Sequence, residues 1–286
     1  MTARQTVAGA GVAAAAAGAA TLVMAARRWE RRTRDVNDRL ARAGGIHHDV
    51  YSERELDALP PVVQRYFRAA LVDGQPIVRH AHVVQRGTFN MGTPAAHAWK
   101  PFTAVQDFYP LAPGFVWNAR VRLLPGVNAF VRDAFADGEG SMRAAAFGLF
   151  TVADAHGTPE VASAALVRYL AEMPWVPTAL LPSQGVRWSV VSDSSARATL
   201  NAGQTTASLV FHFGRDGLPT GCETLRDHDT LKTKMPWGGT YVGQIERSGM
   251  KVPGRAEVFW RLPSGYFPYW RGTIEPTYET VPSRSP

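Results

Sequence analysis

Apolar and polar residues alternate with a period of two over most of the chain after about residue 77. In one run Trp117, Ala119 and Val121 alternate with polar neighbours, and later runs of the same kind include Phe211 and Trp260. A period of two is typical of a strand that buries one face and exposes the other. The pattern therefore predicts a protein built mainly of strands.

Turn-forming residues separate these runs at short intervals, as at Asp137-Gly138, Asp216-Gly217 and Ser264-Gly265. Short connections of this kind join antiparallel neighbours. We expect a mostly antiparallel meander. The predicted strands lie near residues 77–91, 99–109, 114–124, 128–137, 140–150, 186–191, 195–201, 204–213, 218–227, 236–247, 251–262 and 267–278.

Two amphipathic helices accompany the strands. One begins at Pro60-Pro61, and the other runs over about residues 160–173, with Thr158 as its cap and Pro159 in its first turn. A shorter helix is predicted from Ser52 to Leu59. Both longer helices need an apolar surface to cover. The predicted fold class is mainly β (α+β), a large curved antiparallel sheet or half-barrel with helices on its concave side, and a closed barrel is the alternative.

The segment before the strands has a different character. Residues 7–26 carry no charge, and five arginines follow within eight residues. About 20 uncharged residues suffice for a helix to cross a bilayer. We predict a transmembrane anchor over residues 1–26, a basic helical stalk and linker over 27–58, the sheet domain over 59–280 and a disordered tail over 281–286. Because alanine dominates the run, a cleaved signal peptide and a soluble extension stay open.

The formal net charge of +7 is concentrated near the N-terminus. Residues 1–45 hold 8 Arg and 3 acidic residues, a net +5, which leaves +2 for the remainder. The basic excess therefore favours anionic membrane lipids as partners, and we expect no nucleic acid. The positive-inside rule predicts a single-pass cell-membrane protein whose main domain faces the cytoplasm. The composition does not predict an oligomeric state.

Charged residues on three successive predicted strands form the first candidate site. Arg120, Arg122, Asp133 and Arg143 lie on these strands, and Glu172 lies on the inserted helix. Arginine side chains on the concave face could bind an anion or a lipid headgroup. Asp133 or Glu172, with Arg143, could also serve as a base in a cofactor-independent enzyme. The alternative is a solvated outer face with ordinary ion pairs.

Aromatic residues are frequent in and around the strands. Trp175 and Trp188 are the members of this set that we include among the ligand-binding candidates. Aromatic rings along a concave sheet suit an apolar ligand, although packing in the core would use the same residues.

Metal and cofactor chemistry have little support. His80 and His82 share one face of a strand, but no third ligand can be placed, so we expect no metal site. The single cysteine, Cys222, excludes an internal disulfide and a multi-thiolate site, and we expect it to be structural. No nucleophile elbow, zinc-protease motif or phosphate loop occurs, so catalytic residues remain unknown and no cofactor is expected.

Three segments resemble a bacterial family known only as a domain of unknown function. They are residues 168–172 (RYLAE), 177–188 (PTALLPSQGVRW) and 268–272 (PYWRG), and the resemblance runs from about Leu59 to Tyr278. It implies no activity. The order of strands and helices also resembles the half-barrel of LolA-type lipoprotein carriers, which is a likeness of fold.

The features together favour a membrane-anchored domain whose curved sheet binds a lipid-like or other apolar ligand. The enzyme described above and a protein-interaction domain at the membrane are the alternatives. The LolA-type resemblance argues against a cytoplasmic domain, because those carriers work outside the cytoplasm.

Overall fold

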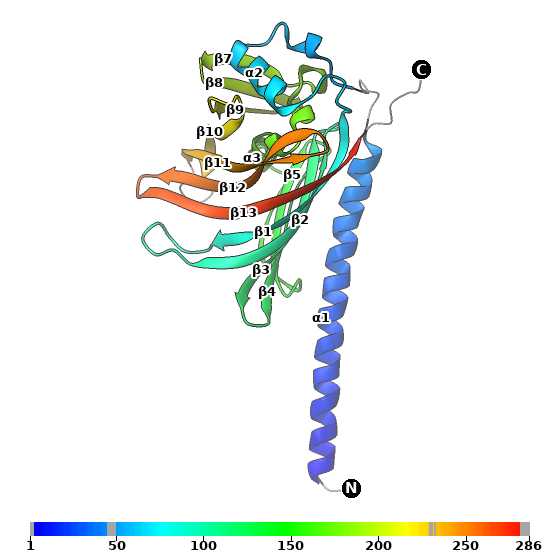
Figure 1. The fold of residues 1–286 in the computed structure, drawn as a ribbon. Coiled ribbons are helices and arrows are strands. Elements are labelled where there is room, and N and C mark those ends of the chain that lie inside the picture. The colour runs from blue at the N-terminus through cyan, green and yellow to red at the C-terminus, as the bar shows by residue number, and fades with distance from the viewer. Residues whose placement is uncertain (1–2, 45–49, 229–230, 232, 281–286) are drawn as a thin grey trace.

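The computed structural model describes residues 3–44, 50–228, 231 and 233–280, with side chains from residue 16 onward. One antiparallel sheet of 13 strands dominates the described chain (Figure 1). Its strands are β1 (Val78–Asn90), β2 (Trp99–Tyr109), β3 (Gly114–Leu124), β4 (Val127–Ala136), β5 (Glu139–Ala146), β6 (Phe150–His156), β7 (Arg187–Ser192), β8 (Ser195–Ala202), β9 (Thr205–Phe213), β10 (Pro219–His228), β11 (Thr233–Arg247), β12 (Met250–Leu262) and β13 (Gly265–Thr280).

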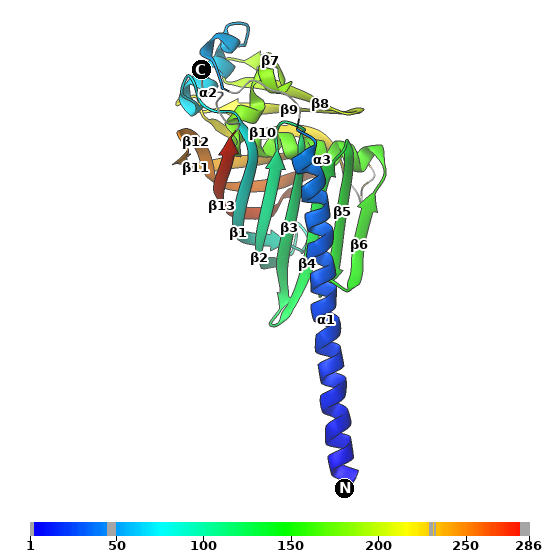
Figure 2. The same ribbon diagram turned by 90° about the vertical axis from the view of Figure 1, so that its right-hand side faces the viewer.

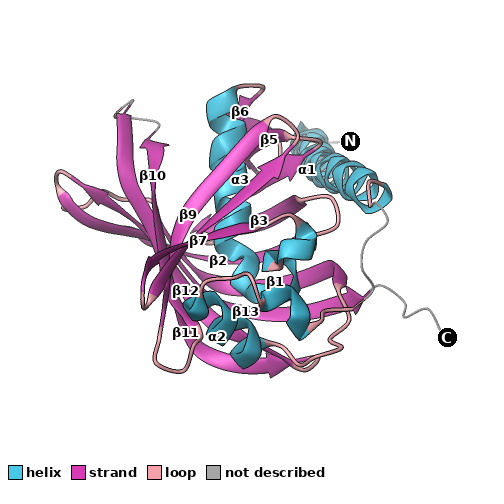
Figure 3. Cartoon of the chain, turned by 90° about the horizontal axis from the view of Figure 1, so that it is seen from above, coloured by secondary structure: helices cyan, strands magenta, loops and turns pink. Residues whose placement is uncertain are grey.

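The sheet consists of two meanders. The strand order is β6-β5-β4-β3-β2-β1-β13-β12-β11-β10-β9-β8-β7, so β1 pairs with β13 and joins the two halves. The end strands β6 and β7 do not pair with each other, and the sheet stays open. Seen from above, it curves around the helices on its inner side (Figure 3). The predicted half-barrel architecture is confirmed.

The prediction of one strand over residues 140–150 was wrong. β5 ends at Ala146, and the chain reverses at Phe147 and Gly148, whose φ angles are 54° and 70°, into the separate strand β6. Two successive positive φ angles are typical of hairpin turns that usually contain Asn-Gly or Asp-Gly. Phe-Gly lacks that signature, so the sequence pattern did not indicate the turn.

Two α-helices and several 3₁₀ turns lie on the concave side. They are η1 (Glu53–Leu56), α2 (Pro61–Ala70), α3 (Pro159–Glu172), η2 (Met173–Trp175), η3 (Pro177–Leu180) and η4 (Pro182–Gln184). As predicted, Thr158 caps α3, where its hydroxyl accepts from the backbone N–H of Val161 at 3.3 Å, and Pro159 occupies the first turn.

The main core lies between these helices and the inner face of the sheet. Phe108 on β2 and Phe115 on β3 are fully buried, and Tyr169 of α3 packs on Phe108 with ring centroids 6.2 Å apart. Tyr66 and Phe67 of α2 are buried in the same core. Each such ring contributes about 1.5–3 kcal/mol relative to an exposed position. Packing of α2 and α3 therefore stabilises the curvature of the sheet.

The C-terminal part of a long helix, α1 (Ala3–Arg42), lies on the opposite, convex face against β2, β3 and β4, and the N-terminal part extends beyond the sheet (Figure 2). The side chains that face the sheet recur about every four residues, and they are Ala25, Trp29, Thr33, Val36 and Leu40. This spacing places them on one side of the helix. The arginines between them are exposed. Part of the predicted basic stalk is thus docked on the sheet.

The predicted anchor falls largely outside the residues whose side chains are described, because these begin at residue 16. Across the described part of the chain, no helix combines the length and the apolar character needed to span a membrane. The predicted tail, residues 281–286, also lies outside the described residues.

Candidate functional site

A cavity of about 290 Å³ lies on the concave side of the sheet, against α3. Its walls come from α3, from η2 and from both halves of the sheet, namely β1, β3, β4 and β5 on one side and β10 to β13 on the other. This volume is at the lower end of the ~300–1,000 Å³ that ligand pockets occupy. Side chains therefore do not fill the concave face completely.

Aromatic rings make up much of the cavity wall. Trp237 and Trp260 are direct cross-strand partners on β11 and β12, and the indole N–H of Trp237 donates to the hydroxyl of Tyr269 at 2.9 Å. The rings of Trp175 and Trp270 lie 6.4 Å apart. Such a wall suits an apolar or amphipathic molecule.

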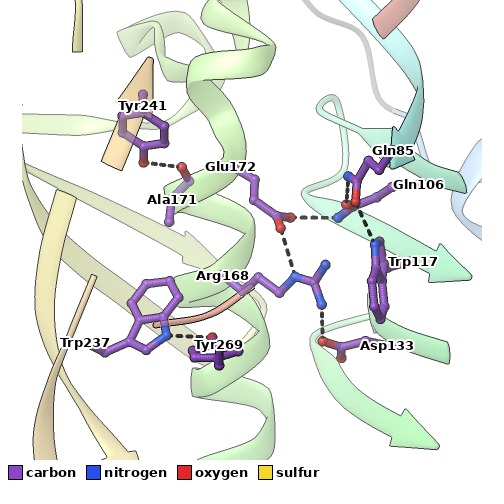
Figure 4. A network of polar contacts seen from close by, with 10 residues as sticks. All are labelled: Gln85, Gln106, Trp117, Asp133, Arg168, Ala171, Glu172, Trp237, Tyr241 and Tyr269. Atoms are coloured by element: carbon purple, nitrogen blue, oxygen red, sulfur yellow. Dashed lines mark hydrogen bonds and ion pairs between the residues drawn. The ribbon is translucent and has the colours of Figure 1, made fainter. Parts of the chain in front are cut away.

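A charged triad in the cavity wall joins α3 to the sheet (Figure 4). The guanidinium of Arg168 donates from Nη1 to Asp133 Oδ2 at 2.6 Å and from Nε to Glu172 Oε1 at 3.0 Å. The side-chain exposures are 17% for Arg168, 20% for Asp133 and 13% for Glu172. The triad is therefore largely withdrawn from water, where charge-assisted hydrogen bonds are strong.

Two glutamines extend this network along the sheet. Gln106 donates to Glu172 Oε2 at 2.7 Å, Gln85 donates to the side-chain oxygen of Gln106 at 2.8 Å, and Trp117 donates to the side-chain oxygen of Gln85 at 2.8 Å. Gln85 and Gln106 are buried, so their amides need these partners. The chain of bonds fixes the orientation of Glu172.

Burial and charge act against each other in the triad. Burial lowers the pKa of Arg168, but the carboxylates of Glu172 and Asp133 outweigh it, so the pKa is raised and the guanidinium stays charged. Burial raises the pKa of Glu172, and the neighbouring Arg168 reduces this rise without cancelling it. Glu172 is thus easier to protonate than an ordinary glutamate.

Local sequence places these groups on the cavity side. Arg168 and Glu172 are four residues apart on α3, which puts them on one helix face. Asp133 lies directly opposite Trp117 in the pairing of β3 with β4, and opposite residues point to the same side of a sheet. Because Trp117 faces the core, Asp133 does as well.

The structure places Arg120, Arg122 and Arg143 on the convex face of the sheet, apart from Asp133 and Glu172. Arg120 forms an ion pair with Glu30 of α1 on the convex face, and Arg122, two residues further on the same strand, is exposed on that face. Arg143 pairs with Asp154 at 3.7 Å and lies opposite Arg132, which also contacts α1. Alternation along β3 places Trp117 and Arg120 on opposite faces.

The two tryptophan candidates, Trp175 and Trp188, lie in different parts of the structure. Trp175 lines the cavity on η2, whereas Trp188 does not. Trp188 packs on Phe67 and Phe211, with ring centroids 6.3 and 5.7 Å away, and donates to the carbonyl of Leu180 at 2.9 Å. Trp188 thus belongs to the core beneath α2.

Cys222 lies in the cavity wall and is 3% exposed. The hydroxyl of Tyr241 donates to the carbonyl of Ala171 at 2.6 Å and also lies 3.0 Å from the Cys222 sulfur. Burial raises the pKa of the Cys222 thiol to about 11. The thiol therefore stays protonated near neutral pH and is a poor nucleophile.

Sequence reasoning missed Arg226 on β10, which also lines the cavity. Its guanidinium carbon lies 5.2 Å from the Trp237 ring centroid and 5.8 Å from that of Trp260. These distances are within the range of cation–π contacts. The alternation of β10 could have placed Arg226 on the same face as Cys222 and Thr224, but nothing in the sequence pairs it with the two tryptophans.

His80 and His82 lie outside the cavity. Both contact Asp107 Oδ1, at 3.0 and 2.8 Å, and His80 also approaches Glu279 at 3.4 Å. Asn37 of α1 donates to the other oxygen of Asp107 at 3.1 Å, which places this cluster on the convex side. Within the described residues, no group of three or more His, Cys, Asp or Glu side chains is arranged to hold a metal ion.

Solved structures with a related arrangement include a LolA superfamily protein from Nitrosomonas europaea. It is 9% identical, the match covers 77% of this chain and 93% of that chain, and the TM-score is 0.41. A beta-barrel-like protein of a domain of unknown function, DUF1849, from Brucella abortus is 9% identical, with coverage of 71% and 98% and a TM-score of 0.26. No curated protein sequence matches the chain.

The family comparison covers most of the sheet domain. Residues 57–277 match the Family of unknown function (DUF6920). These limits lie close to the range from about Leu59 to Tyr278 expected from the three motifs, and the match includes all of them. The chain belongs to this family of unknown function.

Proposed function

We propose that the curved sheet binds a lipid-like or other apolar ligand in the cavity beside α3. The observation that carries this proposal is the unfilled volume of about 290 Å³ with an aromatic wall. Burial of an apolar chain there is favoured by about 25 cal/mol for each Å² removed from water. Trp175, Trp237 and Trp270 supply large rigid surfaces for it.

Glu172 and Asp133 suit a structural role better than acid–base catalysis. Both oxygens of Glu172 are engaged, one by Arg168 and the other by Gln106. Asp133 is bound to the same arginine. Arg143, the third member of the enzyme hypothesis, points to the other face of the sheet. The triad therefore supports binding by holding α3 over the cavity.

Native mass spectrometry of the protein purified from its cells is the first test. We expect a bound amphiphile of discrete mass that dissociates on denaturation. Val258 lines the cavity, so Val258→Trp should fill the space and abolish the adduct. Val190 on β7 is 65% exposed, and Val190→Trp is the matched control that should retain it. Equal occupancy in both variants would show that the ligand lies elsewhere.

We also propose that the N-terminal helix attaches the domain to the cell membrane with the sheet on the cytoplasmic side. The uncharged run over residues 7–26 supports this, as do the five arginines that follow it and are exposed on α1. Anionic headgroups attract such a cluster, and its translocation is disfavoured.

Phosphatase and fluorescent reporters fused after Pro286 test the orientation. Fluorescence without phosphatase activity is expected, and strong phosphatase activity would reverse the assignment.

A further inference from the structure

Arg226 is a further charged residue of the cavity wall, on β10, in the other half of the sheet from Asp133 on β4. Trp237 and Trp260 are direct partners on β11 and β12, and Thr224 on β10 is the partner of Trp237. Arg226 follows Thr224 by two residues, so it projects from the same face. Its guanidinium carbon lies 5.2 and 5.8 Å from the two indole centroids.

The acidic side chains around the cavity already have cationic partners. Asp133 and Glu172 are bound by Arg168, and Glu257 is bound by Arg271. Arg226 has no carboxylate within 4.0 Å and no hydrogen-bond acceptor among residues 16–44, 50–228, 231 and 233–280. Its direct side-chain contacts are with the faces of aromatic rings, and these contacts are weaker than pairing with an anion.

Among the described residues, the buried polar atoms of the cavity wall that lack a hydrogen-bond partner are all donors. In the described part of the chain, three side chains of the wall have a buried nitrogen without an acceptor, and these are Arg226 Nε, Trp175 Nε1 and Trp270 Nε1. Guanidinium and indole groups donate and do not accept. A buried donor without a partner is unfavourable, because it has lost its hydrogen bonds to water. The cavity wall therefore carries donor groups that lack an acceptor, and the guanidinium of Arg226 is the charged one among them.

We propose that the ligand is a single-chain anionic amphiphile, whose carboxylate or phosphate monoester pairs with Arg226 while its chain lies on the aromatic wall. This inference rests on the proposed function, because it names the class of ligand that the same cavity takes. A planar guanidinium can stack on Trp237 and Trp260 and still offer two parallel N–H groups to an anion. The cavity thus combines an apolar surface with one anion-binding group.

Three ligands with the same chain test the headgroup: decanoate, decyl phosphate and decanol. The full-length protein, freed of bound lipid, is titrated with each one and followed by calorimetry and tryptophan fluorescence. We expect the two anions to bind at least about tenfold more tightly than the alcohol, as expected for a hydrogen-bonded charge. The ratio of the decanoate affinity to the decyl phosphate affinity shows whether the site prefers a carboxylate or a phosphate monoester.

Two arginine variants test whether Arg226 is the residue that binds the anion. Arg226→Gln should weaken binding of both anions by about tenfold and leave that of decanol unchanged. The matched control is Arg261→Gln, because Arg261 also stacks on two rings, Phe259 and Tyr266, but is exposed and does not line the cavity. It should bind all three ligands as the wild type does. If Arg226→Gln does not fold, the wild type still tests the class of headgroup, because equal affinities for the anions and for decanol would overturn the inference.

The outcomes separate this inference from the proposed function. Equal affinity of the wild type for decanoate and decanol would overturn the inference about the headgroup and leave apolar binding intact. An anion preference that persists in Arg226→Gln would assign the anion site to another residue and overturn it as well. Absence of binding for all three ligands would overturn the proposed function itself.

Discussion

Arg168 on α3 and Asp133 on β4 form a short ion pair, with Nη1 and Oδ2 2.6 Å apart, that ties the helix to the sheet beside the cavity. Both side chains are largely buried, and Glu172 binds the same guanidinium from within α3. The pair joins segments that are 35 residues apart in sequence. The position of α3, and with it the shape of the cavity, depends on this contact.

Removal of Asp133 should destabilise the fold. Asp133→Ala leaves Arg168 with one carboxylate, and breaking a largely buried pair costs about 3–5 kcal/mol. Urea denaturation measures the change in the free energy of unfolding. Arg143→Ala is the control, because Arg143 and Asp154 form a more exposed pair and such pairs contribute about 0–1 kcal/mol. Equal losses in the two variants would contradict the buried role of Asp133.

Trp29→Ala should release α1 from the convex face. The indole is 5% exposed and donates to Asn118 at 2.9 Å, and loss of a buried tryptophan costs about 3–5 kcal/mol of local packing. Hydrogen exchange of the α1 backbone should rise, while ligand binding on the concave side stays unchanged. Arg31→Ala is the control, because Arg31 lies on the exposed side of the same helix. Unchanged exchange in Trp29→Ala would show that this contact does not hold the helix.

The His80 cluster predicts a pH dependence of stability. Burial lowers the pKa of His80, but bonding to Asp107 and Glu279 outweighs it, so the pKa lies above its ordinary 6.5. Because the folded state binds the proton more tightly, this stabilisation is complete below about pH 6.5 and is lost as the pH rises through the folded pKa. The advantage of the wild type over His80→Gln should therefore be larger at about pH 6 than at about pH 8.

The same comparison needs a histidine that has no carboxylate partner among the described residues. His97 packs on the rings of Trp99 and Phe267, so His97→Gln serves as the control for the loss of a histidine, and identical behaviour of the two variants would contradict the role of Asp107 and Glu279. At acidic pH, Asp107 contributes to stability with the opposite dependence on pH from His80. Bonds from His80 and His82 overcome the effect of burial and lower the pKa of Asp107, so its contribution is present above its ordinary 3.8 and disappears as the pH falls through the folded pKa.

Cys222 should resist alkylation in the folded protein. Its thiol is buried, and its pKa of about 11 leaves little thiolate near neutral pH. We expect no modification by iodoacetamide over the time in which the denatured chain reacts completely, as followed by mass spectrometry. Rapid modification of the native protein at Cys222 would mean that the cavity wall opens on that timescale.

The sequence pattern determined the strands because the signals for them are local. Alternation around Trp117 and turn pairs such as Asp216-Gly217 act over a few residues, and the resulting strands agree closely with β3, β9 and β10. The start of α3 was predictable for the same reason, since Thr158 caps a helix within one turn. The turn at Phe147-Gly148 was missed because its residues are unusual for that geometry.

The tertiary structure alone decided which side chains share the cavity. The alternation of β3 already separates Trp117 from Arg120, but the inward position of Asp133 follows from its pairing with Trp117 across strands. Arg226 meets Trp237 and Trp260 only because β10, β11 and β12 lie side by side. Hydrophobic alternation determines where a strand forms and which face it buries, whereas cross-strand register and the curvature of the whole sheet determine which buried groups meet.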